Sequence, residues 1–217
     1  MAHKVFIDGD VGTTGLQIRE RLERRGDIAL VRIVPALRKA NAARLAAFAE
    51  AEVAILCLPD PAAKEIVAAC DGAGVKTRLI DASPAHRTAS GWTFGFPELA
   101  AGQRDAIRSA TRVTNPGCWS TCAIALLRPL VDAGVVAPDA PIAISGVSGY
   151  SGGGKSMIAE YEARRAPDFV VYGLGLGHKH VPELQKYALL TRRPIFVPSV
   201  ADYAQGMIDS IPLHLDT

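Results

Sequence analysis

In the N-terminal half of the chain, short apolar runs alternate with longer segments of helical periodicity. The run from Val53 to Pro59 is almost continuously apolar, as in a parallel strand that is covered on both faces. Strands that alternate with helices favour an α/β fold with a parallel sheet. This pattern predicts strands at Lys4–Asp8, Ile28–Val34, Val53–Pro59 and Arg78–Ser83, and helices at Leu16–Leu22, Asn41–Ala51 and Pro61–Cys70.

Three glycines separate the first predicted strand from the first predicted helix. Gly9, Gly12 and Gly15 recur at intervals of three, so the spacing departs from the usual G-x-G-x-x-G of dinucleotide-binding turns. A strand, a glycine turn and a helix together bring backbone N–H groups up to a pyrophosphate. We therefore predict a nucleotide-binding turn, with a plain tight turn as the alternative.

The residues after the second predicted strand bear on the choice of cofactor. An acidic residue there would bind the ribose hydroxyls of NAD. Arg38 and Lys39 follow instead, and they suit the additional phosphate of NADP. The alternative is that both are solvated charges in front of a helix. Ligands of open α/β sheets gather at the carboxyl ends of strands, and the candidates there are Pro59, Asp60, Asp81, Ala82 and Ser83, although Asp81 could equally cap a turn.

The C-terminal half has the pattern of a mixed sheet. Strands are predicted at Pro141–Val147, Pro194–Val200 and Gly206–Leu215, with a helix at Met157–Arg165. These elements fit an α+β sheet with helices on one face. An unpaired edge strand near Ile208–Leu215 would be an aggregation risk.

Cys118 is the leading candidate for chemistry. It follows Asn115, Pro116 and Gly117 and precedes an apolar helical run. Pro116 suits the first position of a helix, which would place Cys118 in the first turn. Unpaired N–H groups and the helix dipole stabilise a thiolate there, so the segment points to covalent catalysis. The alternative is a small buried hydrophobe, the role we assign to Cys57 and Cys70.

A second motif competes for the function. Gly149 to Ser156 matches the phosphate-loop pattern G-x-x-x-x-G-K-[ST] of nucleoside triphosphatases. No later strand ends in an aspartate for Mg²⁺, and the remaining sequence is too short for a complete domain of that class. A glycine-rich loop with Lys155 at the start of a helix is still a good phosphate cradle.

His178 and His180 form an H-x-H pair in front of Val181, Pro182 and Glu183. No Cys or carboxylate cluster accompanies them at metal-ligand spacing, so we predict no metal site. A histidine that acts as acid and base beside the cysteine is the more useful hypothesis, because its ordinary pKa lies near neutrality.

Composition adds constraints. The 217 residues are 49% hydrophobic and 21% charged, with a net charge of +2 and no long basic run. Nothing points to nucleic acid or a membrane. Four cysteines in such a chain do not form a disulfide scaffold, and no secretory signal is evident, so we expect a reducing cytoplasm.

Together these motifs resemble the short form of N-acetyl-γ-glutamyl-phosphate reductase over essentially the whole chain. The resemblance rests on Gly9–Gly15, Asp81–Arg87, Gly95–Glu98, Asn115–Cys118, Ser145–Lys155 and His178–Glu183. It implies a Rossmann-like NADP-binding domain at 1–116, followed by a mixed α+β domain at 117–217 that binds substrate and builds a homo-oligomer, a dimer or a tetramer. Family members are roughly a third to a half longer, so the second domain is expected to be incomplete at its C-terminal end.

The resemblance also implies a reaction. NADPH would reduce the acyl phosphate of N-acetyl-L-glutamyl 5-phosphate to N-acetyl-L-glutamate 5-semialdehyde, a step of arginine biosynthesis, through a thioester on Cys118. His180 would be the acid and base, with His178 as the less favoured candidate for that role. The remaining expected contacts are Gly9, Gly12, Thr13, Thr14, Gly15, Arg38, Pro59 and Ser83 for NADP(H), and Ser148, Gly149, Tyr150, Ser151, Lys155 and His178 for the substrate and its phosphate.

Three alternatives remain open. Another acyl-phosphate reductase, such as an aspartate-semialdehyde dehydrogenase, would keep the mechanism and change the substrate. A phosphate-loop protein would use Gly149–Ser156 with Mg²⁺ and ATP or GTP. A non-catalytic module would bind NADP(H) and turn nothing over.

Overall fold

The computed structural model describes residues 2–214, which divide into two compact units. The N-terminal unit comprises residues up to 95 together with 102–116, and the C-terminal unit comprises 96–101 together with the residues from 117 onward. No helix within 2–214 has the length and apolar character that a membrane crossing requires.

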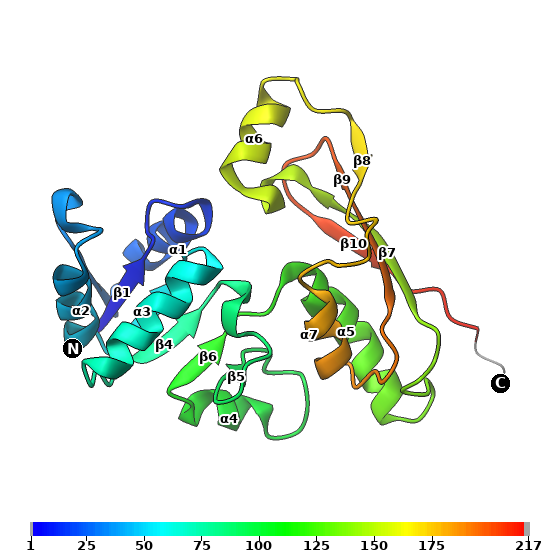
Figure 1. Cartoon of the computed structure of the whole chain (residues 1–217), viewed down its shortest axis with the longest axis horizontal. Helices are drawn as coiled ribbons and strands as arrows, with labels where there is room; N and C mark the ends of the chain where they lie inside the picture. Colours follow the sequence, from blue (N-terminus) through cyan, green and yellow to red (C-terminus); the bar gives the residue numbers. More distant parts are fainter. Residues whose placement is uncertain (1, 215–217) are drawn as a thin grey trace. The chain divides into compact units, whose positions relative to one another are not determined.

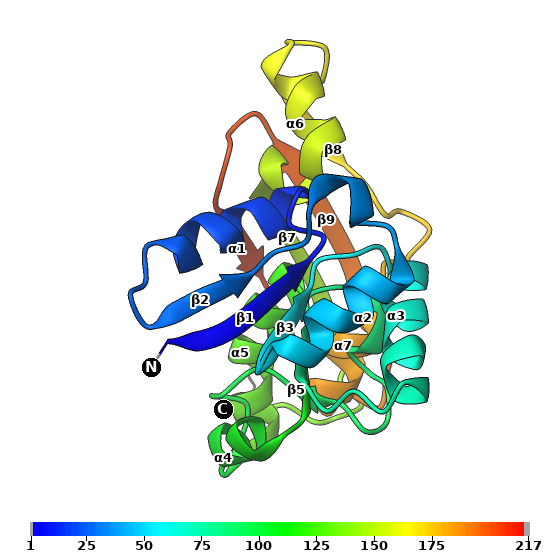
Figure 2. The same ribbon diagram turned by 90° about the vertical axis from the view of Figure 1, so that its left-hand side faces the viewer.

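The first unit is a parallel sheet with helices on both faces (Figure 1). The strands, in the order β2-β1-β3-β4-β6-β5, all run in the same direction. Helix α1 lies on one face, and α2 and α3 lie on the other (Figure 2). The bounds are β1 His3–Asp8, α1 Thr13–Glu23, β2 Ile28–Val31, α2 Asn41–Glu50, β3 Val53–Leu56, α3 Asp60–Gly72, β4 Arg78–Asp81, β5 Thr93–Phe94, α4 Gln103–Ser109 and β6 Arg112–Thr114, with short 3-10 turns η1 Pro35–Leu37 and η2 Pro84–His86.

The position of β1 prepares a ligand site. It lies between β2 and β3, so the chain leaves β1 toward one edge of the sheet and later returns to its other side. Such a reversal opens a crevice at the carboxyl ends of the strands. The core beneath it is apolar, with Phe6 of β1 packed edge-on against Phe48 of α2 at a ring distance of 5.1 Å.

The second unit is a four-stranded mixed sheet in the order β10-β7-β9-β8. Strands β7 and β9 are parallel, and β10 and β8 are antiparallel to their neighbours. Helices α5 and α7 pack against each other, and α5 also contacts β10 (Figure 1). The bounds are α5 Cys118–Asp132, β7 Ala143–Gly149, η3 Tyr150–Gly153, α6 Gly154–Glu162, β8 Phe169–Val171, α7 Val181–Tyr187, β9 Ile195–Ala201 and β10 Met207–Ser210.

The predicted fold class, a Rossmann-like parallel sheet followed by a mixed α+β unit, is confirmed. Several predicted boundaries were wrong. Strand β2 ends at Val31 and not at Val34, and α6 begins at Gly154 and ends at Glu162, three residues before the predicted bounds at both ends. Strand β10 is an edge strand as expected, but it stops at Ser210, and residue 215 of the predicted strand lies outside the described residues.

Candidate active site

Cys118 is the first residue of α5, and its side chain is exposed. Gly117 is the N-cap, so Pro116 lies two residues before the helix and not at its first position as predicted. The predicted place of Cys118 in the first turn is confirmed. An exposed thiol at the start of a 15-residue helix lies near the positive end of the helix dipole, which favours a thiolate.

A buried carboxylate holds the backbone just before Cys118. Glu183, in the first turn of α7, is 1% exposed. Its Oε2 atom accepts a hydrogen bond of 3.0 Å from the backbone N–H of Gly117. A charge-assisted bond of this kind is stronger than a bond between neutral groups. It fixes the entry into α5 and therefore the starting point of the Cys118 side chain.

Aromatic rings surround the first turn of α5. The indole N–H of Trp119 donates to the hydroxyl of Tyr172 at 3.1 Å, and the Tyr172 ring lies 5.9 Å from that of His178. The pKa of Tyr172 is raised above its ordinary value, mainly by burial, although the hydrogen bond from Trp119 lowers it in part and the Cys118 charge adds to the rise. Tyr172 is thus bonded to Trp119, the residue after Cys118, and its ring lies near that of His178.

The two histidines differ in environment. His180 is 4% exposed, whereas His178 is half-buried, and their rings are 4.8 Å apart. The backbone N–H of His180 donates to Nδ1 of His178 at 3.3 Å, which leaves the His178 proton on Nε2. Burial lowers the pKa of His178, and Lys179 adds to this effect. His178 is therefore neutral near pH 7 and can donate a hydrogen bond from Nε2.

The other cysteines are poor nucleophiles. Burial raises the pKa of Cys57 to about 12 and that of Cys70 to about 11. Burial also raises the pKa of Cys122, which lies one helical turn after Cys118. Cys118 is the exposed one among the four cysteines.

The glycine-rich segment after β7 has the predicted strand, loop and helix, but part of its backbone is already bonded. The N–H groups of Gly149, Tyr150 and Ser151 donate to the carbonyls of Gly206, Tyr203 and Ala204, at 2.9, 2.9 and 3.1 Å. A nucleotide phosphate loop needs such N–H groups for its ligand. This geometry disfavours the nucleoside triphosphatase hypothesis. It leaves the start of α6, with the exposed Lys155, as the part of the segment that could bind a phosphate. Ser148 is buried, and its hydroxyl donates to the Gly149 carbonyl.

In the first unit, two glycines of the turn, Gly9 and Gly15, have no room for a side chain. Gly9 has a φ of +92°, and a Cβ there would collide with the Cys57 carbonyl oxygen. A Cβ on Gly15 would collide with the carbonyl oxygen of Gly9, and Gly12 is the N-cap of α1, which begins with Thr13 and Thr14. The turn is thus packed tightly against β3 with the helix N-terminus beside it, as a pyrophosphate site requires.

A cavity of about 730 Å³ opens beside this turn. Its apolar wall includes Phe6, Ile33 and Leu58, and its cations are Arg32, Arg38, Lys39 and Arg44. This volume falls in the range of small-molecule sites. An apolar wall suits a base, and the cations suit a phosphate. Gly9 and Arg38 both line this cavity. The other predicted cofactor contacts are not among its lining residues: Gly12, Thr13, Thr14, Gly15, Pro59 and Ser83.

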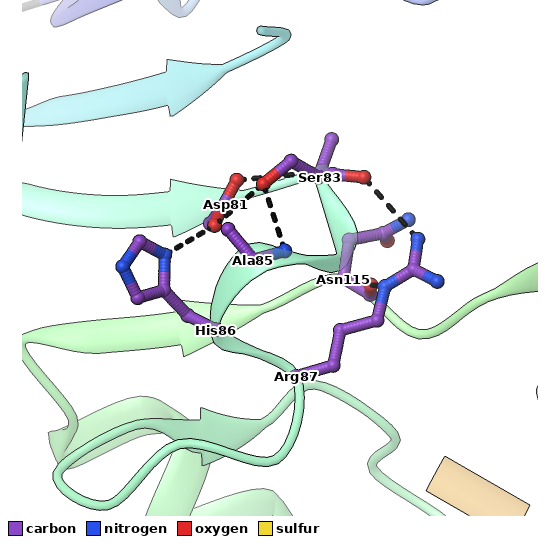
Figure 3. A network of polar contacts seen from close by, with 7 residues as sticks. Asp81, Ser83, Ala85, His86, Arg87 and Asn115 are labelled. Atoms are coloured by element: carbon purple, nitrogen blue, oxygen red, sulfur yellow. Dashed lines mark hydrogen bonds and ion pairs between the residues drawn. The ribbon is translucent and has the colours of Figure 1, made fainter. Parts of the chain in front are cut away.

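Ser83 belongs to a separate network at the end of β4 (Figure 3). Asp81, fully buried, accepts bonds from the backbone N–H and hydroxyl of Ser83 at 2.8 and 3.0 Å, and its Oδ2 lies 2.6 Å from Nδ1 of His86. Asp81 therefore caps a turn, the alternative that the sequence left open. Arg87 in the same loop donates to the carbonyl of Asn115 at 3.0 Å, and so restrains the segment that leads toward Cys118.

Comparison with known proteins shows which family the chain belongs to. The N-acetyl-gamma-glutamyl-phosphate reductase of Chelativorans sp. (strain BNC1) is 54% identical over 217 residues, which cover 99% of this chain and 69% of that protein. The protein of the same name from Brucella ovis is 52% identical over 99% of this chain and 71% of its own length. The chain belongs to the N-acetyl-γ-glutamyl-phosphate reductase family.

Residues 118–217 of this reductase-family chain also match a family model described as the semialdehyde dehydrogenase dimerisation domain. The aspartate semialdehyde dehydrogenase II of Vibrio cholerae, solved with ASA, superposes with a TM-score of 0.72 at 16% identity, over 97% of this chain and 74% of that one. The aspartate semialdehyde dehydrogenase of Candida albicans, solved with NADP, gives 0.62 at 14% identity, over 100% and 72%. These similarities show a shared fold.

The structure adds Glu183, Tyr172 and Arg44 to the candidate site residues. Glu183 was part of a quoted motif but received no role, because a glutamate in a first helical turn is ordinary. Nothing in the local sequence of Tyr172 or Arg44 marks them. No group of three His, Cys, Asp or Glu side chains suited to a metal occurs within residues 2–214.

Proposed function

We propose that this chain reduces N-acetyl-L-glutamyl 5-phosphate to N-acetyl-L-glutamate 5-semialdehyde with NADPH, through a covalent intermediate on Cys118. The observation that carries the proposal is the exposed Cys118 at the start of α5, in a chain that is 54% identical to a reductase of this name. The helix N-terminus favours the nucleophilic thiolate, which is the form that attacks an acyl phosphate.

The cofactor would bind in the first unit. Gly9 and Gly15 let the turn pack closely on neighbouring backbone, and Gly12 is the N-cap of α1. The start of α1 at Thr13 and Thr14 would bind the pyrophosphate. The cavity offers an apolar wall for the adenine, and Arg38 and Lys39 for the phosphate that distinguishes NADPH from NADH. When bound, the cofactor supplies the hydride that reduces the thioester.

The side chains of the second unit would carry the acyl transfer. His180 takes the proton of the Cys118 thiol, and the thiolate attacks the acyl carbon. The bond from carbon to the phosphate oxygen breaks, inorganic phosphate leaves toward Lys155, and a thioester remains. After reduction, the thiohemiacetal oxyanion is stabilised by backbone N–H groups at the start of α5, a contribution of about 3 kcal/mol in such sites. Its collapse releases the aldehyde and restores the Cys118 thiolate.

His178 has a different proposed role. Its neutral ring with the proton on Nε2 makes it a hydrogen-bond donor to the substrate, and the pKa lowered by burial keeps it uncharged. Ser148, Gly149, Tyr150 and Ser151 would shape the substrate pocket more than they bind phosphate, because the three N–H groups of 149–151 already have backbone partners.

We also propose a homo-oligomer formed through the second unit, since the matching family model is a dimerisation domain. The outward face of the mixed sheet carries Phe169, Val171 and Ile208, which are 55%, 42% and 66% exposed. They line a shallow groove of about 400 Å³ with Val147 and Val197. Exposed apolar patches of this kind mark interfaces. A thiol nucleophile fits the reducing cytoplasm.

Substrate competition tests the assignment. With NADP⁺ and phosphate, N-acetylglutamate semialdehyde should be oxidised far faster than aspartate semialdehyde. A preference for aspartate semialdehyde would instead support the related dehydrogenase. Hydrolysis of ATP or GTP that does not depend on Cys118 would support the phosphate-loop alternative.

A further inference from the structure

Asp10 occupies a distinctive place in the cavity of the first unit. It lies in the glycine turn between β1 and α1, and Asp10 and Arg38 both line the cavity. Its Oδ2 atom is 3.6 Å from Nη2 of Arg38 and 3.5 Å from Nη1 of Arg19. A carboxylate thus stands beside the cation that the proposed function assigns to a cofactor phosphate.

The arginines that line this cavity differ in how strongly neighbouring carboxylates bind them. Arg44 donates from Nε and Nη2 to Oδ2 of Asp8 at 3.2 and 2.6 Å, and the two side chains are only 12% and 7% exposed. Burial raises the pKa of Asp8, and the bond from Arg44 offsets part of that rise. Separating a buried ion pair leaves an uncompensated charge, which is costly. Arg44 is therefore expected to stay paired with Asp8.

Arg38 is held loosely by comparison. Its distance to Asp10 is long for an ion pair, and the two side chains are 38% and 26% exposed. Pairs of this kind contribute about 1 kcal/mol or less. A phosphate dianion that accepts two hydrogen bonds from a guanidinium is a stronger partner. Arg38 can therefore leave Asp10 at little cost.

We propose that Asp10 is a displaceable counter-ion that sets the affinity for the phosphate of the cofactor and the selectivity for NADPH over NADH. The inference rests on the proposed function, because it takes the cavity to be the cofactor site. Arg38 turns from Asp10 to the phosphate when NADPH binds, and Arg19 keeps Asp10 paired, so no charge is stranded. Asp10 also repels the phosphate, and both effects weaken NADPH binding while leaving NADH almost unaffected.

Another role for Asp10 makes the opposite prediction. Acidic residues in NAD sites accept hydrogen bonds from ribose hydroxyls. In that case Asp10 would strengthen the binding of NADH, and its removal would weaken it.

Equilibrium titration of NADPH and NADH by cofactor fluorescence tests the proposal on wild type, Asp10→Asn, Arg38→Gln and the double variant. Asp10→Asn should tighten NADPH binding about 3- to 10-fold and change NADH binding by less than about twofold. In the Arg38→Gln background the tightening should shrink to the part that comes from direct repulsion between Asp10 and the phosphate, because the contribution through Arg38 is lost. Asp27→Asn is the matched control, since it removes the same charge from an exposed pair with Arg25, away from the cavity lining.

The possible outcomes distinguish the proposed cofactor site from the proposed role of Asp10. If wild type binds neither cofactor, the assignment of the cavity falls, and the role of Asp10 falls with it. If wild type binds NADPH while Asp10→Asn binds it equally or more weakly, only the role of Asp10 is overturned. A loss of NADH affinity in Asp10→Asn would assign Asp10 to the ribose instead. If the asparagine amide still binds Arg38, the Asp10→Ala variant is used in the same cofactor titration.

Discussion

Glu183 accepts a hydrogen bond of 3.0 Å from the backbone N–H of Gly117, the residue immediately before Cys118. Glu183 lies in the first turn of α7, and Gly117 is the N-cap of α5. A single buried carboxylate therefore ties together the beginnings of two helices. The bond makes Glu183 a positioning residue for the proposed nucleophile.

The first prediction concerns Glu183 itself. Glu183→Ala should lower kcat about 10- to 100-fold, with a smaller change in KM, because Cys118 loses its fixed starting point and the backbone N–H loses its partner. Glu183→Gln keeps an acceptor oxygen and should recover most of the rate. Both variants are assayed after thermal unfolding has verified that they fold. Equal activity of Glu183→Ala and wild type would remove Glu183 from this role.

Thiol reactivity should be selective. Iodoacetamide at pH 7.5 should modify Cys118 first, because it is exposed at a helix N-terminus while burial raises the pKa of Cys57 to about 12 and that of Cys70 to about 11. Peptide mass spectrometry over a time course measures the order. Cys118→Ser is the control, in which early labelling should disappear. Labelling of Cys57 or Cys70 before Cys118 would contradict the structure.

Asp209 should make stability depend on pH. Both its carboxylate oxygens are buried without a hydrogen-bond partner in residues 2–214, and burial raises its pKa to about 6. The folded state then holds a proton that the unfolded state releases near pH 4, so stability is lost as the pH rises from about 4 to about 6.

Asp209→Asn removes this titration. It should stabilise the chain by about 1–2 kcal/mol at pH 7, after allowance for partial solvent screening, and have little effect near pH 4. Urea unfolding of both proteins across this range gives the difference. A difference that does not vary with pH would show that Asp209 is not the group responsible.

Lys155 should act on phosphate. Lys155→Ala should raise the KM for phosphate in the reverse reaction about tenfold or more and leave NADPH affinity unchanged, because the exposed Lys155 lies in the first turn of α6. Lys76→Ala serves as the control, because Lys76 is an exposed lysine in the loop before β4 and does not line the cofactor cavity. An unchanged dependence on phosphate would exclude Lys155 from the site.

The fold was predictable where local pattern decides it. The strand at β1, the glycine turn and α1 follow from periodicity and from the steric demands at Gly9 and Gly15. The place of Cys118 in a first helical turn was also predictable. The start of α5 relative to Pro116 was not predictable, because Gly117, and not a residue before Pro116, is the N-cap.

What the sequence could not show depends on contacts between distant segments. The N–H groups of 149–151 bond to residues 203–206, and no local pattern predicts that pairing. The bond from Gly117 to Glu183 spans 66 positions, and the buried pair of Asp8 with Arg44 spans 36. A motif can identify such residues, but only the fold shows what they bind.

The central claim is that Cys118 carries the reaction. The most direct measurement follows NADPH formation from N-acetylglutamate semialdehyde, phosphate and NADP⁺, with wild type and Cys118→Ser side by side and NADPH binding measured for both. We expect phosphate-dependent formation in wild type and its loss in Cys118→Ser, with cofactor affinity unchanged. Near-normal turnover by Cys118→Ser would contradict covalent catalysis at this residue.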